Sequence, residues 1–198
     1  MTRDRDVAAF GERAPVYEDG WLGRLHHEIA DRCADLALAG SPSPQRILDV
    51  GCGTGYLLRR LAQRCPAATE LAGVDAAPAM VEVARKAAGD GRLSFTVGTA
   101  EQLPYPAGTF DLVVSTTSFD HWADQQAGLA QCARVLALGG HLVLADLFSA
   151  WLLPTLIGGR RGKARTKRRA SRLLATAGFQ SVSWHHLYPF LQAVTAAR

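Results

Sequence analysis

The nine residues 47–55, with the sequence ILDVGCGTG, constrain the fold more than any other part of the chain. Residues 46–50 have the apolar pattern of a short buried strand, and residues 56–64 have the pattern of a helix. Three alternate glycines stand between them, and glycine admits positive φ angles and lets a ligand approach the backbone closely. The helix that follows points its free N–H groups at this loop. The arrangement predicts a nucleotide-like ligand at the carboxyl end of the strand.

Strands and helices alternate along the rest of the chain. Further apolar runs predict strands at residues 70–75, 93–97, 110–115 and 141–147, with helices at 56–64, 78–88 and 120–136. This alternation is typical of parallel βαβ units in a doubly wound α/β sheet. A helix is predicted at 168–177, followed by strands at 181–187 and 190–195. Because only Tyr188 and Pro189 join these two strands, they form a hairpin, and one end strand runs antiparallel.

The first 40 residues divide into two parts. Residues 1–18 are polar, and we expect them to be irregular. From residue 19 to residue 39, apolar side chains recur every three or four positions, which predicts an amphipathic helix. The segment Gly-Ser-Pro-Ser-Pro at 40–44 then ends this helix.

Composition excludes several classes of protein. With 48% hydrophobic and 20% charged residues, the chain is neither disordered over most of its length nor collagen-like. No apolar run reaches the roughly 18 residues of a membrane-spanning helix, and the first ten residues lack an apolar signal core. None of the four cysteines belongs to a CxxC pair. We therefore expect a reduced, cytoplasmic protein.

The motifs resemble those of one enzyme family. Tyr56 follows the third glycine directly, so the loop is not Gly-x-Gly-x-x-Gly, and no Gly-Lys-Ser/Thr follows as in a P-loop. The pattern Asp-x-Gly-x-Gly-x-Gly at 49–55 instead resembles motif I of class I S-adenosylmethionine (SAM) methyltransferases. Asp75 ends the second predicted strand, where an acid binds ribose hydroxyls in related folds. Residues 98–106, GTAEQLPYP, resemble the loop that contacts the adenine ring in this family. Thr99 stands at the position where the family usually has an aspartate.

Residues 110–114 and 134–140 are similar to the family's fourth strand and to the turn into its fifth strand. The most similar subgroup is that of small methyltransferases related to the enzymes of ubiquinone and menaquinone biosynthesis. The resemblance implies a Rossmann-like, doubly wound seven-stranded sheet of order 3-2-1-4-5-7-6, with strand 7 antiparallel and helices on both faces. It also implies a single methyltransferase domain over residues 1–198, in four parts. These are an N-terminal cap helix (1–40), a SAM-binding core (45–147), a short lid with a basic segment (148–167), and a C-terminal helix and hairpin (168–198).

The resemblance further implies SAM as cofactor, S-adenosylhomocysteine as product, and no metal. No spacing of ligands typical of zinc or magnesium is visible in the sequence. The implied cofactor-binding residues are Tyr17, Asp49, Gly51, Cys52, Gly53, Asp75, Ala76, Thr99, Ala100, Glu101 and Ser115.

His121 is the candidate catalytic residue. Methyl transfer from a sulfonium is an in-line displacement that depends mainly on placing the acceptor atom about 3 Å from the methyl carbon. A base is needed only when the acceptor is protonated. His121 lies just past the fourth predicted strand and is suited to remove a proton near neutral pH. The alternative is a histidine that merely stands at the start of a helix capped by Asp120. Four other histidines are expected to be solvated (His26 and His27) or structural (His185 and His186).

We predict a SAM-dependent methyltransferase acting on a small, partly apolar metabolite at oxygen, nitrogen or carbon. The basic residues at 160–172 keep open an RNA methyltransferase. The absence of interleaved aromatics there, and of Asn/Asp-Pro-Pro-Tyr at 115–118, disfavours nucleic acid as a partner. A third reading is a SAM-binding partner subunit without catalysis. The apolar run 147–157 suits either an acceptor pocket or a contact within a homodimer.

Overall fold

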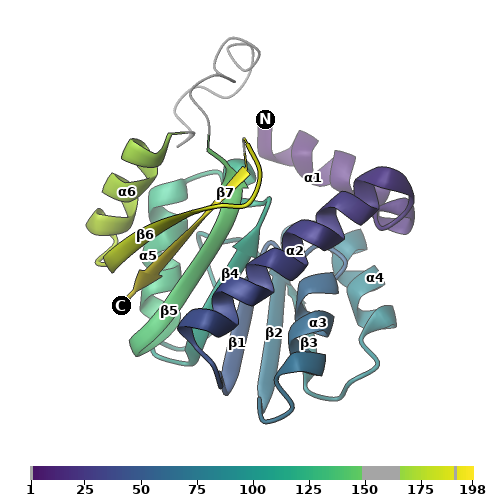
Figure 1. The fold of residues 1–198 in the computed structure, drawn as a ribbon. Helices are drawn as coiled ribbons and strands as arrows, with labels where there is room; N and C mark the ends of the chain where they lie inside the picture. The colour runs from purple at the N-terminus through teal and green to yellow at the C-terminus, as the bar shows by residue number, and fades with distance from the viewer. Residues whose placement is uncertain (1, 149–165, 190) are drawn as a thin grey trace.

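Seven strands form one sheet of order β3-β2-β1-β4-β5-β7-β6 (Figure 1). The structure is a computed structural model that describes residues 2–148, 166–189 and 191–198, the first five of them by their backbone alone. The strands are β1 (Arg46–Val50), β2 (Glu70–Asp75), β3 (Leu93–Val97), β4 (Phe110–Thr116), β5 (Leu136–Leu147), β6 (Gln180–His186) and β7 (Leu191–Ala197). Strand β7 is antiparallel to both β5 and β6, whereas the other pairs are parallel. The predicted fold class and strand order are therefore confirmed.

Helices cover both faces of the sheet. The α-helices are α1 (Thr2–Arg13), α2 (Gly20–Gly40), α3 (Tyr56–Arg64), α4 (Pro78–Ala87), α5 (Gln125–Val135) and α6 (Lys167–Thr176), and two 3-10 turns are η1 (Ala14–Val16) and η2 (Phe119–His121). Buried side chains of α2, α3 and α4 pack on one face, and those of α5 and α6 pack on the other. Adjacent residues of a strand pack on opposite faces of the sheet, as Ile47 and Leu48 do in β1.

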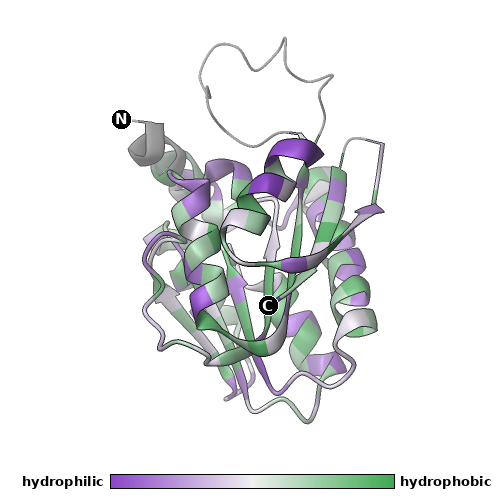
Figure 2. Cartoon of the chain, turned by 90° about the vertical axis from the view of Figure 1, so that its left-hand side faces the viewer, coloured by the Kyte–Doolittle hydropathy of each residue, from purple (hydrophilic) through white to green (hydrophobic). Residues whose placement is uncertain are grey.

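Burial on both faces explains the apolar strands. In β4, Leu112, Val113 and Val114 are all fully buried, as expected for a strand covered on two sides. Figure 2 shows the resulting pattern, with largely green central strands and a purple first turn of α6, where Arg168 and Arg169 are exposed.

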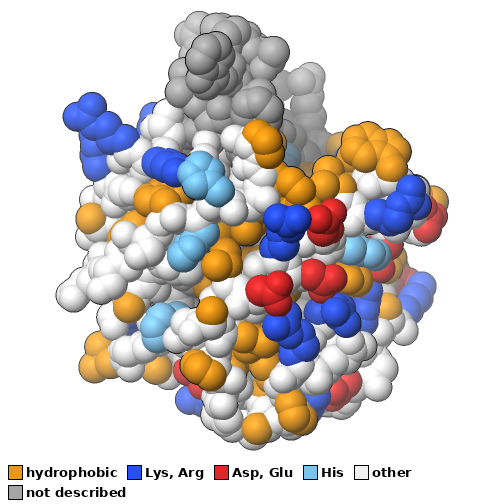
Figure 3. Space-filling model, viewed as in Figure 1, with side chains coloured by type: hydrophobic (Ala, Val, Ile, Leu, Met, Phe, Trp, Pro, Cys, Tyr) orange, Lys and Arg blue, Asp and Glu red, His pale blue; other side chains and the backbone are white. Residues whose placement is uncertain are grey.

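Ion pairs join the outer surfaces of α2 and α3. Arg60 contacts Asp31 at 2.7 Å, and Arg64 contacts Asp35 at 2.8 Å. In Figure 3 blue and red side chains accordingly lie next to one another over these two helices. Such exposed pairs contribute at most about 1 kcal/mol each, so the buried apolar faces supply most of the attachment of α2.

The N-terminal residues depart from the sequence-based expectation. We expected an irregular segment at 1–18, but residues 2–13 form α1 and residues 14–16 form η1. The reason is tertiary packing, because Val7 and Phe10 of α1 pack with Ala14 against Met80 of α4. Two large apolar side chains three positions apart are too weak a pattern to predict a helix without that partner surface.

Two boundaries near β5 were also wrong. The helix predicted to begin at residue 120 begins at Gln125, since the Asp124 side chain caps it by accepting the N–H groups of Gln126 and Ala127. Asp120 is therefore not the N-cap. Strand β5 begins at Leu136 rather than at residue 141. Leu136 pairs with Phe110 before the register shifts, and Gly139, with φ +77°, allows the extra residues to bulge.

Some predicted features fall outside the described residues. Most of the expected lid (148–167) and the first part of the basic segment, residues 160–165, belong to the range 149–165, and so does most of the apolar run 147–157. Phe190, the expected first residue of the last strand, is likewise not described. None of the helices among the described residues combines the length and apolarity needed to cross a membrane.

Candidate functional site

A cleft opens where β1, β2 and β4 end at the carboxyl edge of the sheet. It has a larger lobe with about 790 Å³ of open space and a smaller lobe with about 460 Å³. Five residues line both lobes, which therefore form one continuous cleft: Tyr17, Gly51, Gly53, Thr116 and Thr117. Doubly wound sheets bind their ligands at this edge.

The glycine loop forms the floor of the cleft. The N–H groups of Gly51 and Cys52 both donate to the carbonyl of Val74, at 2.7 and 3.1 Å, which holds the loop against the end of β2. Gly51 has φ +77°, and a Cβ there would collide with the side chain of Ser118. Only glycine fits at this position, because it adopts a positive φ without strain and has no Cβ to collide with Ser118.

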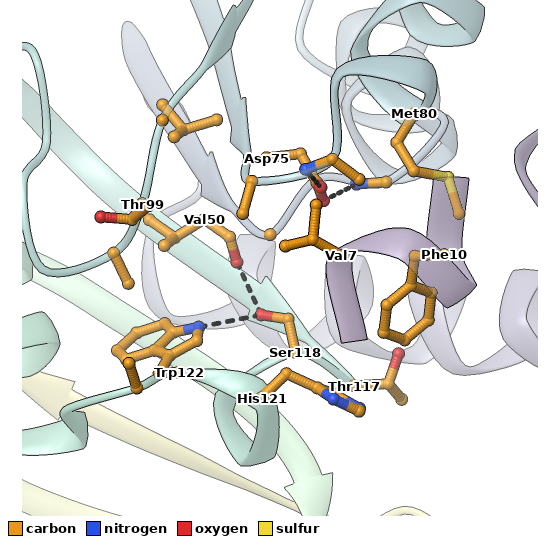
Figure 4. Close-up of a pocket in the computed structure, with 18 of the residues that line it drawn as sticks. Val7, Phe10, Val50, Asp75, Met80, Thr99, Thr117, Ser118, His121 and Trp122 are labelled. Carbon is orange, nitrogen blue, oxygen red and sulfur yellow. Dashed lines mark hydrogen bonds between the residues drawn. The ribbon is translucent and has the colours of Figure 1, made fainter. Parts of the chain in front are cut away.

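Asp75 lies at the end of β2 with its carboxylate directed into the larger lobe (Figure 4). Its Oδ2 accepts the N–H of Gly53 at 2.9 Å, and its Oδ1 accepts the N–H of Ala77 at 2.8 Å. Burial raises the pKa of Asp75, while these two hydrogen bonds favour its charged form. Each carboxylate oxygen keeps a second lone pair with which to accept a ligand hydroxyl.

The walls of the larger lobe are mostly apolar. Val7 and Phe10 enter from α1, and Met80 enters from α4 (Figure 4). The loop after β3 supplies the opposite wall with Thr99, Ala100 and Glu101.

This loop is held from outside the cleft. The guanidinium of Arg134 donates to the carbonyls of Tyr105 and Leu103 at 2.7 and 2.9 Å. The ring of Trp122, which also lines the larger lobe, packs so closely on Gly128 that a Cβ at that glycine would meet it, and the same Cβ would lie 3.2 Å from the Cβ of Ala100. Contacts within the protein therefore hold Thr99, Ala100 and Glu101 in place at the larger lobe before any ligand binds.

His121 ends η2 at the edge of the larger lobe. Its ring meets the ring of Phe10 edge to face, with centroids 4.9 Å apart. Figure 4 shows the His121 side chain beside Thr117, which follows β4 and has a positive φ of 49°. A β-branched residue is strained in that region, and such strain is concentrated at functional sites. The turn is anchored because the N–H of His121 donates to the carbonyl of Ser118 at 2.9 Å.

The smaller lobe is polar and contains a buried acid. Asp49, the first residue of the Asp-x-Gly-x-Gly-x-Gly pattern, is 1% exposed, and its Oδ1 accepts no hydrogen bond. Burial and the neighbouring Asp75 carboxylate raise the pKa of Asp49 to about 8. A buried carboxyl oxygen without a partner costs stability, so a cationic or hydrogen-bond-donating ligand at this point would be favoured.

Glu18 ties the N-terminal segment to the glycine loop. Its Oε1 accepts hydrogen bonds from Thr54 Oγ1 at 2.6 Å and from Arg59 at 2.7 Å. Burial acts to raise the pKa of Glu18, but these two hydrogen bonds hold it below its usual range. The preceding residue, Tyr17, is thereby placed over both lobes, where burial raises the pKa of its hydroxyl.

The structure brings together ten of the eleven residues that the sequence assigned to cofactor binding, together with His121. The exception is Ser115, which lines neither lobe. It is 1% exposed, and its hydroxyl donates to the carbonyl of Val50 at 2.8 Å. Ser115 therefore joins β4 to the end of β1 and supports the floor of the cleft from below.

Several lining residues were missed by the sequence analysis. Val7 and Phe10 were missed because helix α1 was not predicted. His26 and His27 were expected to be solvated, and this was wrong, since both are half-buried in the smaller lobe. His26 stacks on Tyr17 with centroids 4.9 Å apart, and His27 stacks on Tyr56 at 3.7 Å. Helical periodicity places both on α2, but only the packing of η1 and α3 against that helix shows what covers them.

His185 behaves as the sequence suggested, since its Nε2 lies 3.0 Å from the hydroxyl of Thr195 on the neighbouring strand. Within the parts of the chain that the structure describes, no three His, Cys, Asp or Glu side chains are grouped as metal ligands.

Comparison with known proteins identifies the family. Residues 48–144 match the model of a methyltransferase domain. The chain is 44% identical over 142 residues to a demethylmenaquinone methyltransferase of Deinococcus radiodurans, covering 69% of this chain and 58% of the relative. It is 37% identical over 172 residues to a malonyl-[acyl-carrier protein] O-methyltransferase of Geobacter sulfurreducens, covering 80% and 64%. The chain belongs to the class I SAM-dependent methyltransferase family.

The fold is shared with solved structures. A chain in the complex between the Haloferax volcanii Trm112 methyltransferase activator and a methyltransferase superimposes with a TM-score of 0.78 at 21% identity, covering 95% of this chain and 96% of that one. At that identity the similarity shows the fold alone. This class I family member spans about three fifths of the length of the curated relatives named above, 58% and 64%.

The cleft of this family member suits the family's cofactor. The half-buried carboxylate of Asp75 faces the larger lobe, the glycine loop gives close access to the backbone, and Asp49 leaves a buried oxygen unsatisfied in the smaller lobe. Asp75 suits the ribose of a nucleoside, the glycine loop suits a substituent of that nucleoside passing close to the backbone, and Asp49 suits a cationic group at the end of the substituent.

Proposed function

We propose that this protein transfers a methyl group from SAM to a small, partly apolar metabolite by in-line displacement. The observation that carries the proposal is the meeting of the glycine loop and the Asp75 carboxylate at one cleft, joined by the 2.9 Å hydrogen bond from Gly53. Support also comes from the relatives, which are named for methyl transfer to demethylmenaquinone and to malonyl-[acyl-carrier protein].

The larger lobe is proposed to hold the adenosine part of the cofactor. Asp75 accepts the ribose hydroxyls, and Ala76 continues the same wall. Thr99, Ala100 and Glu101 form the adenine end, where Thr99 offers a hydroxyl in place of a carboxylate. Tyr17, Asp49, Cys52 and the loop glycines surround the other end of the cofactor. When bound, SAM supplies an activated methyl group.

His121 is proposed as the base that takes the proton of the acceptor. It lies at the edge of the larger lobe and meets Phe10, so an acceptor beside it would rest on apolar side chains. No Lys or Arg stands among the described residues that line either lobe. This lining favours an acceptor that is neutral where it enters the cleft, such as a phenol or an enol.

The two rival functions find no support in the cleft. None of the described residues of the basic segment, 166–172, lines either lobe, as an RNA methyltransferase using that segment would need. A SAM-binding subunit without catalysis would not need His121 at the lobe edge. We propose metal-independent transfer by a single domain over residues 1–198, and a homodimer stays an open prediction.

Calorimetric titration tests the proposal. The purified protein is titrated with SAM, with S-adenosylhomocysteine and, as a control nucleotide, with NADH. Saturable binding of the two adenosyl ligands alone is the expected result, followed by turnover in a screen of quinols, phenols and acyl thioesters. Binding of NADH in preference to the adenosyl ligands would reject the proposed cofactor.

A further inference from the structure

A buried acid at the end of β5 takes no part in the proposed cofactor site. Asp146 is 4% exposed and is not among the residues that line either lobe. Burying a carboxylate is costly unless hydrogen bonds replace the lost water, so its donors show what it holds. Its Oδ1 accepts the N–H of Leu147 at 2.6 Å, and its Oδ2 accepts the N–H of Asp120 at 2.9 Å. Both donors are backbone groups, so Asp146 holds main chain in place.

The bond to Asp120 reaches the turn that carries His121. Asp120 and Asp146 are 26 positions apart, and Asp120 directly precedes His121 in η2. The bond therefore joins the end of β5 to the middle of this turn. A hydrogen bond with an ionised acceptor is roughly twice as strong as one between neutral groups. Asp146 thus fixes the backbone from which the His121 side chain extends to the edge of the larger lobe (Figure 4).

Other side chains hold the first part of the same turn. The hydroxyl of Ser118 donates to the carbonyl of Val50 at 2.9 Å (Figure 4). The side-chain amide of Gln125 donates to the carbonyl of Phe119 at 3.0 Å. These two bonds join neutral groups and act where the turn begins. The carboxylate of Asp146 acts one residue further on, directly before the proposed base.

Asp146 also interacts electrostatically with His121. Burial raises the pKa of Asp146, whereas the N–H groups of Leu147 and Asp120 favour its charged form. The Asp120 carboxylate acts to raise the pKa of Asp146, and a protonated His121 acts to lower it, so Asp146 and His121 are near enough to attract one another. Asp75, which lines the larger lobe, is affected by His121 in the same direction. A nearby carboxylate stabilises the imidazolium that forms when a histidine accepts a proton.

We infer that Asp146 is a positioning residue for His121, whose carboxylate holds the η2 turn so that the imidazole faces the acceptor at the edge of the larger lobe. The inference rests on the proposed function, in which His121 is the base. Asp146 acts through the backbone N–H of Asp120 and does not itself touch the cofactor or the acceptor. Removal of its carboxylate therefore slows methyl transfer without weakening cofactor binding.

The test is a double-mutant cycle measured in turnover. Wild type, Asp146→Ala, His121→Ala and the double variant are assayed with saturating methyl-tritiated SAM, so that low residual rates are still counted. The acceptor is the quinol, phenol or acyl thioester that the wild type methylates fastest in the screen. Calorimetry gives the affinity of each variant for S-adenosylhomocysteine, and thermal unfolding checks that each one folds. If Asp146→Ala does not fold, Asp146→Leu, which fills the site but accepts no hydrogen bond, replaces it in the cycle.

Asp111→Ala is the matched control. The carboxylate of Asp111 also accepts two backbone N–H groups from a distant segment, those of Gln45 at 2.8 Å and Arg46 at 3.1 Å. Asp111 lies near the start of β4, whereas the cleft lies at the other end of this strand. This variant therefore loses the same kind of contact away from the cleft, and its turnover is expected to equal that of the wild type.

Asp146→Ala is expected to lower turnover about 10- to 100-fold, the loss that follows when a catalytic group is displaced by about 1 Å. Its dissociation constant for S-adenosylhomocysteine stays within about twofold of the wild type, because Asp75 and the glycine loop are unchanged. In the His121→Ala background the same substitution changes turnover by less than about twofold, since the group that Asp146 positions is already gone.

Different outcomes separate this inference from the proposed function. If the wild type methylates no acceptor in the screen, the proposed function fails and the inference falls with it. If His121→Ala keeps wild-type turnover, methyl transfer stands but His121 is not the base, and Asp146 has nothing to position. Wild-type turnover in Asp146→Ala, or an equal loss with and without His121, overturns the inference alone. A loss as large in Asp111→Ala would also overturn it, because any buried backbone contact would then have the same effect.

Discussion

The carboxylate of Asp75 accepts a hydrogen bond of 2.9 Å from the N–H of Gly53, and so the end of β2 is tied to the middle of the glycine loop. The two residues are 22 positions apart in sequence. Their contact holds the carboxylate at the floor of the cleft before any ligand arrives. A group held in this way loses little conformational entropy on binding, which favours affinity.

Asp75→Ala is expected to weaken binding of S-adenosylhomocysteine by about 1–3 kcal/mol, the range for loss of hydrogen bonds to a charged group. The calorimetric dissociation constant measures this. Glu82→Ala is the control, because Glu82 is an exposed acid on α4 paired only with Lys86. An unchanged affinity in Asp75→Ala would remove Asp75 from the ribose-binding role.

Gly51→Ala is expected to destabilise the fold by about 2–5 kcal/mol, the sum of a positive φ in a non-glycine residue and an overpacked contact with Ser118. Urea unfolding followed by circular dichroism gives the free energy. Gly91→Ala is the matched control, since a Cβ at Gly91 meets nothing within 4 Å and its φ is not positive. Equal effects of the two substitutions would show that the glycine loop tolerates a Cβ at position 51.

Asp49 is expected to make the free protein less stable as the pH rises. Its pKa is about 8 in the folded protein and about 3.9 in the unfolded chain, so the folded state binds more protons between these values. The free energy of unfolding therefore falls with increasing pH, by up to about 1.4 kcal/mol per pH unit from this group.

Asp49→Asn removes that titration, so the dependence of the urea midpoint on pH between 5 and 8 should become flatter than in the wild type. Asp35→Asn serves as control, because Asp35 is an exposed partner of Arg64. Parallel pH curves for the wild type and Asp49→Asn would contradict the raised pKa of Asp49.

His121→Ala is expected to lower turnover on a protonated acceptor by about 10²–10⁴-fold, the usual contribution of a positioned base. Its affinity for S-adenosylhomocysteine should stay within about twofold of the wild type, since Asp75 and the loop are untouched. Initial rates with an acceptor from the screen, together with calorimetry, check both points. Wild-type turnover in this variant would show that His121 is not the base.

Much of the fold follows from local patterns. The glycine loop, the apolar strands and the helices between them were predicted within a few residues, because each depends on neighbouring side chains and on turn chemistry. The short Tyr188-Pro189 link likewise predicted the antiparallel hairpin. The boundaries that failed, at Gln125 and Leu136, depend on a side-chain cap and on a bulge whose partners lie elsewhere in the chain.

The sequence by itself determined the glycine loop, the acid at Asp75 and the alternation that makes a doubly wound sheet, since these are set by backbone conformation and by hydrophobic periodicity. Only the tertiary structure decided that α1 forms, that Ser115 does not line the cleft, and that His26 and Asp49 line one lobe. Those outcomes depend on contacts between residues far apart in sequence, and the burial that leaves Asp49 Oδ1 and His26 Nδ1 without partners exists only once those contacts have formed.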